Sequence, residues 1–161
     1  MPPYYLGEAG PVPAWLPEDA LEPEMINRGN CSPVVLVVED DVEMNELERE
    51  LLAVHGFETL PAYTGTEAVA MSRKNHPDAV LLDVMLPEMD GFETCWRLIQ
   101  QENDRHLPVI IVSALAEDES RRRGYASGAS AYFAKPFDPD EVVATLRKLI
   151  ALDRVSHAPP R

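Results

Sequence analysis

The stretch Val34–Asp41, which reads VVLVVEDD, decides the fold. Its first five residues, Val34–Val38, are all apolar, and a short run of this kind is typical of a strand buried on both faces of a sheet. Three acidic residues, Glu39, Asp40 and Asp41, follow it directly. The stretch therefore predicts an interior strand that ends in a cluster of acids.

Further strands are expected on both sides of this pattern. Two more apolar runs, Ala79–Leu82 and Val109–Val112, have the same buried character. Phe57–Tyr63 is a weaker strand, and Pro61 within it suits the edge of a sheet because proline cannot donate to a strand ladder. Ala131–Ala134 is a short fifth strand.

Helical patterns fill the intervals between the strands. Asp41 is a candidate N-cap for a first helix, in which Met44, Leu47, Leu51 and Val54 recur at helical spacing. The four later helices are expected after the capping box Thr64/Glu67, from Gly91 to about Gln101, over Arg121–Arg123 up to Gly128, and after the start signal Asp138-Pro139.

Strict alternation of strands and helices predicts parallel strands joined by right-handed crossovers. We therefore expect one three-layer α/β domain over residues 33–151, with a flavodoxin-like (βα)5 topology and a five-stranded sheet in the order 2-1-3-4-5. The proline-bearing second strand then lies at an edge of the sheet.

Both ends of the chain differ from this domain. Residues 1–32 hold six prolines and five acids and are expected to form a linker or arm. Leu21 and Met25, spaced like neighbours on one helix face, leave open whether this arm is a loose tail or docks on a partner or on its own domain. Residues 152–161 are expected to form a tail, too short for an output domain.

Composition excludes several classes of function. The net charge is −14, with 28 acids against 14 Lys and Arg, whereas direct nucleic-acid binding usually needs a basic face. We expect no nucleic-acid contact. The sequence has no apolar run of ~18 residues and no secretory signal, so we expect no membrane span and a cytoplasmic location. Cys31 and Cys95 have no metal-site spacing.

Candidate functional residues follow the strands, at the sheet edge where open parallel sheets bind ligands. They are Glu39, Asp40, Asp83, Ser113 and Lys135. Packed carboxylates repel by ~4 kcal/mol per pair at 4 Å for an effective dielectric near 20, so they either hold protons or bind a hard cation such as Mg²⁺. The lysine indicates an anion that binds reversibly. A carboxylate near a metal and a lysine can attack a phosphoryl group and form an acyl phosphate.

With its segments VVLVVEDD, LLDVMLPEMDGFE, VIIVSA and AYFAKPF, the sequence resembles the CheY-like receiver domain of bacterial response regulators. The resemblance spans residues 33–151. It implies that Asp83 accepts phosphate from a phosphohistidine on a sensor histidine kinase. It also implies Mg²⁺ ligation by Asp40, Asp83 and the backbone carbonyl of Met85, with Glu39 acting through water.

The same resemblance assigns the remaining site residues. It implies that Lys135 pairs with the phosphoryl group, that Ser113 hydrogen-bonds to it, and that Tyr132 is a switch aromatic that turns inward when Ser113 moves. It also implies a cis Lys135–Pro136 bond. Met85 and Leu115 match positions that flank the path of the attacking water, and because both are apolar we expect slow self-dephosphorylation.

These observations favour a stand-alone receiver that is a phospho-acceptor and not an enzyme in the usual sense. Its output is expected from a changed surface, formed by the helix carrying Arg121–Arg123, the strand at 131–134 and the last helix, which binds a protein target or forms a homodimer. Three alternatives stay open. They are a phosphorelay carrier that passes phosphate to a histidine phosphotransfer protein, a hydrolase with an aspartyl phosphate, and a degenerate receiver.

Overall fold

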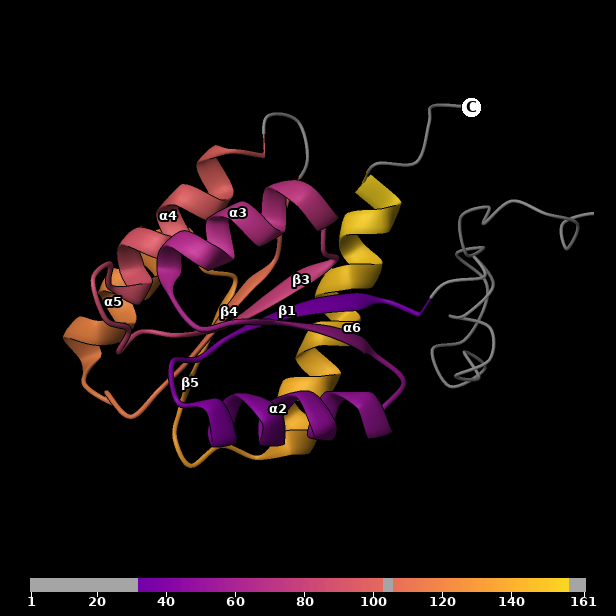
Figure 1. The fold of residues 1–161 in the computed structure, drawn as a ribbon, viewed down its shortest axis with the longest axis horizontal. Helices are drawn as coiled ribbons and strands as arrows, with labels where there is room; N and C mark the ends of the chain where they lie inside the picture. Colours follow the sequence, from indigo (N-terminus) through magenta and orange to yellow (C-terminus); the bar gives the residue numbers. More distant parts are fainter. Residues whose placement is uncertain (1–31, 103–105, 157–161) are drawn as a thin grey trace, which may run out of the picture.

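Five parallel strands form one sheet in the order β2-β1-β3-β4-β5, which confirms the predicted topology (Figure 1). The computed structural model describes residues 32–102 and 106–156. The strands are β1 Val34–Val38, β2 Glu58–Ala62, β3 Ala79–Asp83, β4 Val109–Ser113 and β5 Ala131–Ala134. Pro61 lies on the edge strand β2, as expected.

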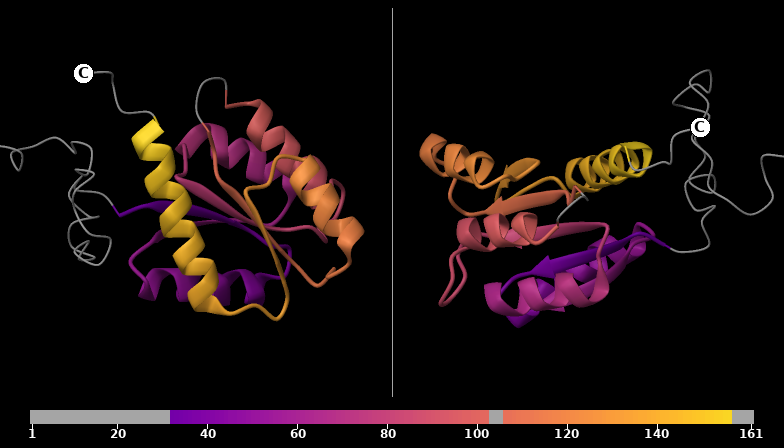
Figure 2. Two further views of the ribbon diagram at one scale, coloured as in Figure 1. Left: turned by 180° about the vertical axis from the view of Figure 1, so that it is seen from behind. Right: turned by 90° about the horizontal axis from the view of Figure 1, so that it is seen from above.

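Helices cover both faces of the sheet and complete three layers (Figures 1 and 2). The helices are α2 Val42–Val54, α3 Gly65–Asn75, α4 Gly91–Gln100, α5 Asp118–Ala126 and α6 Pro139–Ser156. Helices α3, α4 and α5 lie on one face, whereas α2 and α6 lie on the other. Helix α6 continues five residues beyond the expected domain boundary at residue 151.

The apolar run of β1 serves two cores at once. Leu36 and Val38 pack in the core under α3 and α4, whereas Val35 and Val37 point to the core under α2 and α6. Successive side chains of a strand point to opposite faces, so a strand covered by helices on both sides must be apolar at every position.

The predicted helix starts are confirmed. Asp41 accepts a hydrogen bond from the Met44 amide at 2.9 Å, and Thr64 accepts one from the Glu67 amide at 3.1 Å. The Asp138 carboxylate accepts one from the amide of Asp140 at 2.9 Å. Each oxygen satisfies an amide that would otherwise lack a partner in the first turn of a helix.

The apolar pattern of α2 does not mark its buried face. Met44, Leu47 and Val54 are exposed, and the residues of α2 that turn inward are Asn45, Glu48 and Leu52. Two of these three buried side chains are therefore polar, and both reach the carboxyl end of the sheet.

Two further sequence expectations concern the N-terminal arm and a possible membrane span. Leu21 and Met25, the candidate docking residues of the N-terminal arm, lie outside the described residues. Within the described ranges, none of the helices has the length and apolar character needed to cross a membrane.

Candidate functional site

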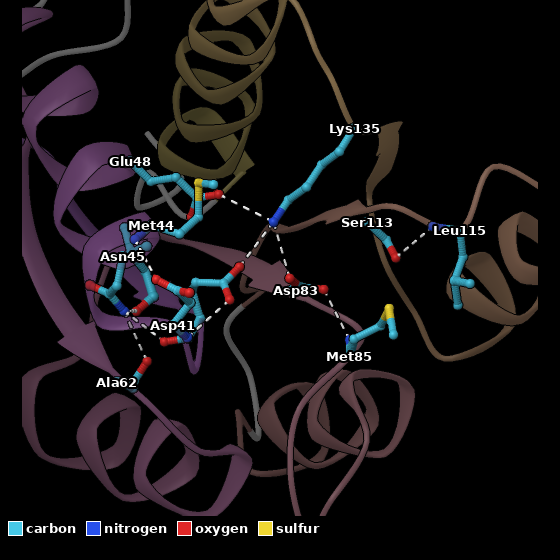
Figure 3. Close-up of polar contacts among 12 residues, drawn as sticks. Asp41, Met44, Asn45, Glu48, Ala62, Asp83, Met85, Ser113, Leu115 and Lys135 are labelled. Carbon is cyan, nitrogen blue, oxygen red and sulfur yellow. Dashed lines mark hydrogen bonds and ion pairs between the residues drawn. The ribbon is translucent and has the colours of Figure 1, made fainter.

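The ammonium of Lys135 lies at the centre of the rim formed by the carboxyl ends of the strands (Figure 3). Its Nζ donates to Glu39 Oε2 at 2.9 Å and to Asp83 Oδ2 at 3.0 Å. These contacts join residues that are 96 and 52 positions apart in the chain. The predicted convergence of Glu39, Asp83 and Lys135 on one site is therefore confirmed.

Strand ends bring these three residues together. Glu39 follows β1, Asp83 is the last residue of β3, and Lys135 follows β5. The Lys135 amide donates to the Ser113 carbonyl at 2.7 Å, which continues the contact between β4 and β5 by one residue. Since parallel strands end at the same edge, segments far apart in the chain can supply one site.

Glu48 is a site residue that the sequence reasoning missed. Its Oε1 lies 3.6 Å from Lys135 Nζ, and its side chain is only 5% exposed. This oxygen accepts no hydrogen bond in the structure. Glu48 lies at helical spacing between Asn45 and Leu52 on the inward face of α2, a face that the apolar pattern of the helix does not mark.

Asn45 was also missed, and it fixes the backbone beside the acids. Its amide nitrogen donates to the carbonyls of Val37, Glu39 and Ala62 at 3.1–3.2 Å. These contacts tie the start of α2 to the ends of β1 and β2. Arg49 Nε donates in turn to Asn45 Oδ1 at 2.8 Å, which holds the amide in this orientation.

Burial and crowding shift the pKa values of the rim. Burial, and then proximity to the Asp83 carboxyl, raises the pKa of Glu39 despite its hydrogen bond from Lys135. Burial also raises the pKa of Glu48 to about 7, with Lys135 opposing the rise. Burial alone would lower the pKa of Lys135, but hydrogen bonds to Glu39 and Asp83 outweigh burial and raise it.

The arrangement leaves an excess of negative charge. With all groups ionised, the three carboxylates of Glu39, Glu48 and Asp83 surround one ammonium, so the cluster is left with two uncompensated negative charges. Carboxylate oxygens with this excess suit a hard divalent cation. Asp40, the next acid along, is exposed beside them.

The described residues do not form a closed metal cage. Among residues 32–102 and 106–156, no three His, Cys, Asp or Glu side chains surround a common point as metal ligands. Glu39 and Asp83 are instead turned to Lys135. Mg²⁺ keeps several waters and takes few protein ligands, so an open rim of oxygen donors fits it better than it fits a metal that needs a full protein shell.

The backbone of Met85 contacts Asp83, and Ser113 is the last residue of the neighbouring strand β4. The Met85 amide donates to Asp83 Oδ1 at 2.9 Å, which fixes the orientation of the carboxylate. The Ser113 side chain is fully buried, and its Oγ accepts from the Leu115 amide at 3.1 Å. Ser113 therefore connects the rim to the loop that leads into α5.

Tyr132 points into the protein. Its ring is buried, and its hydroxyl donates to the Leu115 carbonyl at 2.5 Å. The guanidinium of Arg121 stacks on the ring at 5.2 Å from its centre. Because Ser113 and Tyr132 both bind the backbone of Leu115, one loop residue links the two. The expected cis Lys135–Pro136 bond is present.

Comparison with known proteins agrees with this geometry. The family model described as response regulator receiver domain matches residues 35–147. The DNA-binding dual master transcriptional regulator RpaA of Synechocystis sp. is 35% identical over 127 residues, which cover 78% of this chain and 53% of RpaA. The polar-differentiation response regulator DivK of Brucella ovis is 35% identical over 116 residues, covering 72% of this chain and 94% of DivK.

Solved structures share the fold. One is the receiver domain of sensor histidine kinase PA1611 from Pseudomonas aeruginosa, described with a magnesium ion coordinated in its active site cleft. It is 29% identical, with a TM-score of 0.68, and the match covers 74% of this chain and 98% of that one. This chain spans about half the length of RpaA and similar transcriptional regulators. The chain belongs to the response regulator receiver domain family of two-component signalling systems.

Proposed function

We propose that Asp83 accepts a phosphoryl group from a phosphohistidine of a sensor histidine kinase or a histidine phosphotransfer protein, in a reaction that needs Mg²⁺. The observation that carries this proposal is the contact of 3.0 Å between Lys135 Nζ and Asp83 Oδ2 at the acidic rim. An ammonium beside a carboxylate at a strand end suits a nucleophile whose product is an anion.

The transfer exchanges one bond for another. An Asp83 carboxylate oxygen attacks phosphorus, the P–N bond to the histidine breaks, and its electron pair stays on the imidazole nitrogen. The Met85 amide holds Oδ1 at 2.9 Å, so Asp83 presents a fixed carboxylate. Lys135 Nζ then pairs with a phosphoryl oxygen, and the Ser113 hydroxyl donates to another.

The residues that would hold Mg²⁺ are Asp40, Asp83 and the carbonyl of Met85, with Glu39 acting through water. The charge excess around Lys135 and the exposed carboxylate of Asp40 support this set. When bound, the ion neutralises the oxygens of the transferring group. We place this reaction in the cytoplasm.

The output is proposed to pass through Leu115 to Tyr132. Phosphoryl contact with the Ser113 hydroxyl would move the Leu115 loop, to which Tyr132 is already bound at 2.5 Å. Tyr132 lies on β5 and contacts α5, and the exposed surface of α5, β5 and α6 is the proposed surface for a protein target or a homodimer. No nucleic-acid contact is proposed for this domain, in line with the net charge of −14.

A mass measurement tests the phospho-acceptor role. The full chain is incubated with Mg²⁺ and a small phosphodonor, and its intact mass is recorded with and without a chelator. We expect one phosphoryl adduct that needs Mg²⁺ and is missing from Asp83→Asn. An unmodified wild-type chain would contradict the proposal. Rapid loss of the adduct to a histidine phosphotransfer protein would identify a relay carrier instead.

A further inference from the structure

Glu48 lies across the Lys135 ammonium from Asp83. Figure 3 shows the ammonium between the Glu48 carboxylate on α2 and the Asp83 carboxylate on β3. The other acids of the site end or follow a strand, whereas Glu48 lies inside helix α2. The ammonium therefore has a carboxylate on each side, and only the one on β3 is the proposed nucleophile.

The contacts of Lys135 are unequal. Glu39 Oε2 and Asp83 Oδ2 lie at 2.9 and 3.0 Å and accept two of its three N–H donors. Glu48 Oε1 lies at 3.6 Å, within ion-pair range but beyond hydrogen-bond range. A small shift of the ammonium toward α2 would satisfy this buried oxygen, at the expense of its bond to Asp83.

Phosphorylation changes which groups compete to pair with the Lys135 ammonium. In the proposed reaction, Glu39 and Asp83 interact with the cation and the phosphoryl group, whereas Glu48 binds neither of them directly. The negative charge of Glu48 then has two effects. It attracts any cation that enters the rim, and it repels a phosphoryl group while drawing Lys135 away from it.

We propose that Glu48 is a positioning residue that draws the Lys135 ammonium toward α2, in competition with the phosphoryl group on Asp83. This rests on the proposed function, because it assigns Lys135 to the phosphoryl group. Glu48 thus favours the metal-bound, unphosphorylated domain and limits the stability of the phosphorylated one.

Two titrations of Glu48→Gln test this assignment at pH 8, above the value of about 7 to which burial raises the pKa of Glu48. Isothermal titration calorimetry measures the Kd of Mg²⁺ alone, and then that of beryllofluoride, a phosphoryl analogue, at saturating Mg²⁺. We expect Mg²⁺ to bind about threefold or more weakly and beryllofluoride about threefold or more tightly than in the wild type.

Two controls separate charge from structure. Glu50→Gln removes an exposed acid from the same helix and is expected to leave both constants unchanged. Glu48→Asp keeps the charge in the same pocket, so its Mg²⁺ affinity is expected to lie closer to the wild type than that of Glu48→Gln. A merely structural role would instead weaken both ligands in every Glu48 variant.

The outcomes distinguish the two proposals. A wild-type chain that binds no beryllofluoride contradicts the proposed function, and it also overturns the proposed role of Glu48, which depends on that function. A wild-type chain that binds it, with both constants weakened or both unchanged in Glu48→Gln, overturns the role of Glu48 alone. A double-mutant cycle that combines Glu48→Gln with Lys135→Met measures their coupling in the free energy of unfolding and needs no ligand. Strictly additive effects of the two substitutions would show that Glu48 and Lys135 do not form an ion pair.

Discussion

The ring of Tyr132 lies against the backbone of Gly124 so closely that a Cβ at position 124 would come within 2.8 Å of the ring carbon Cδ2. Gly124 is buried on α5, and the ring fills the space that its missing side chain leaves. The inward position of Tyr132, and with it the hydrogen bond to Leu115, depends on this glycine.

Gly124→Ala is therefore expected to lower the free energy of unfolding by about 1–2 kcal/mol, because the added methyl group overpacks the ring. Alanine inside a helix otherwise stabilises by roughly 0.5–1 kcal/mol, so a loss would be informative. Urea unfolding measures the change. In a Tyr132→Ala background the same substitution should become stabilising, and a gain in both backgrounds would show that the ring does not need the glycine.

Asn45→Ala is expected to cost about 2–3 kcal/mol of unfolding free energy, because the buried carbonyls of Val37, Glu39 and Ala62 lose the side-chain donor that they share. It should also weaken Mg²⁺ binding, since the backbone at Glu39 is released. Urea unfolding and calorimetry check the two effects. Asn75→Ala removes an exposed amide that donates to Met71 and should cost less than ~0.5 kcal/mol. Equal costs at the two positions would refute the buried network.

The stability of the metal-free domain should fall as the pH rises. Burial raises the pKa of Glu48 to about 7 in the folded state, above its ordinary value of 4.5. The folded state therefore binds more protons between these two values, and the resulting stabilisation is complete below pH 4.5 and lost above pH 7. The contribution of Glu48 is about 3 kcal/mol at most. Glu39 shifts in the same direction and adds to it.

Urea unfolding of the metal-free chain at pH 5, 6, 7 and 8 measures this slope. Glu48→Gln cannot titrate at this position, so its stability should fall less over the same range. Identical slopes for the two proteins would mean that Glu48 is ionised in the folded state throughout this range.

Self-dephosphorylation is expected to be slow, on a scale of minutes or longer. The side chains of Met85, which is 58% exposed, and Leu115, which is half-buried, offer no hydrogen bond to an attacking water. Replacing Met85 with Asn should speed the loss of phosphate, as followed by intact mass after removal of the donor. Decay of the wild-type adduct within seconds, without a phosphatase, would contradict this expectation.

Much of the fold was predictable because it follows from local patterns. Continuous apolar runs such as Val34–Val38 marked the strands buried on both faces, and Pro61 marked an edge. The rim was predictable from the same runs, since Asp83 and Lys135 had to meet once the strands were parallel and in the order now observed.

Glu48 and Asn45 could not be found this way. Lys135 is 87 residues from Glu48, so their pairing leaves no local signal. The partners of Asn45 are backbone carbonyls 6, 8 and 17 residues away, and the sequence does not mark which carbonyls a side chain will bind. The exposed apolar residues of α2 also recur at the helical spacing that is typical of a buried face, and Leu47 among them is 59% exposed. Only the packed structure shows which face of this helix turns inward.

The most direct test of the account is the chemical identity of residue 83 after phosphorylation. Borohydride reduces an aspartyl phosphate to homoserine, which peptide mass mapping locates within the chain. After incubation with Mg²⁺ and a small phosphodonor, we predict homoserine at position 83 in the wild type and none in Asp83→Asn. Reduction at another aspartate, or at no residue in a folded wild-type chain, would contradict the assignment of Asp83 as the phospho-acceptor.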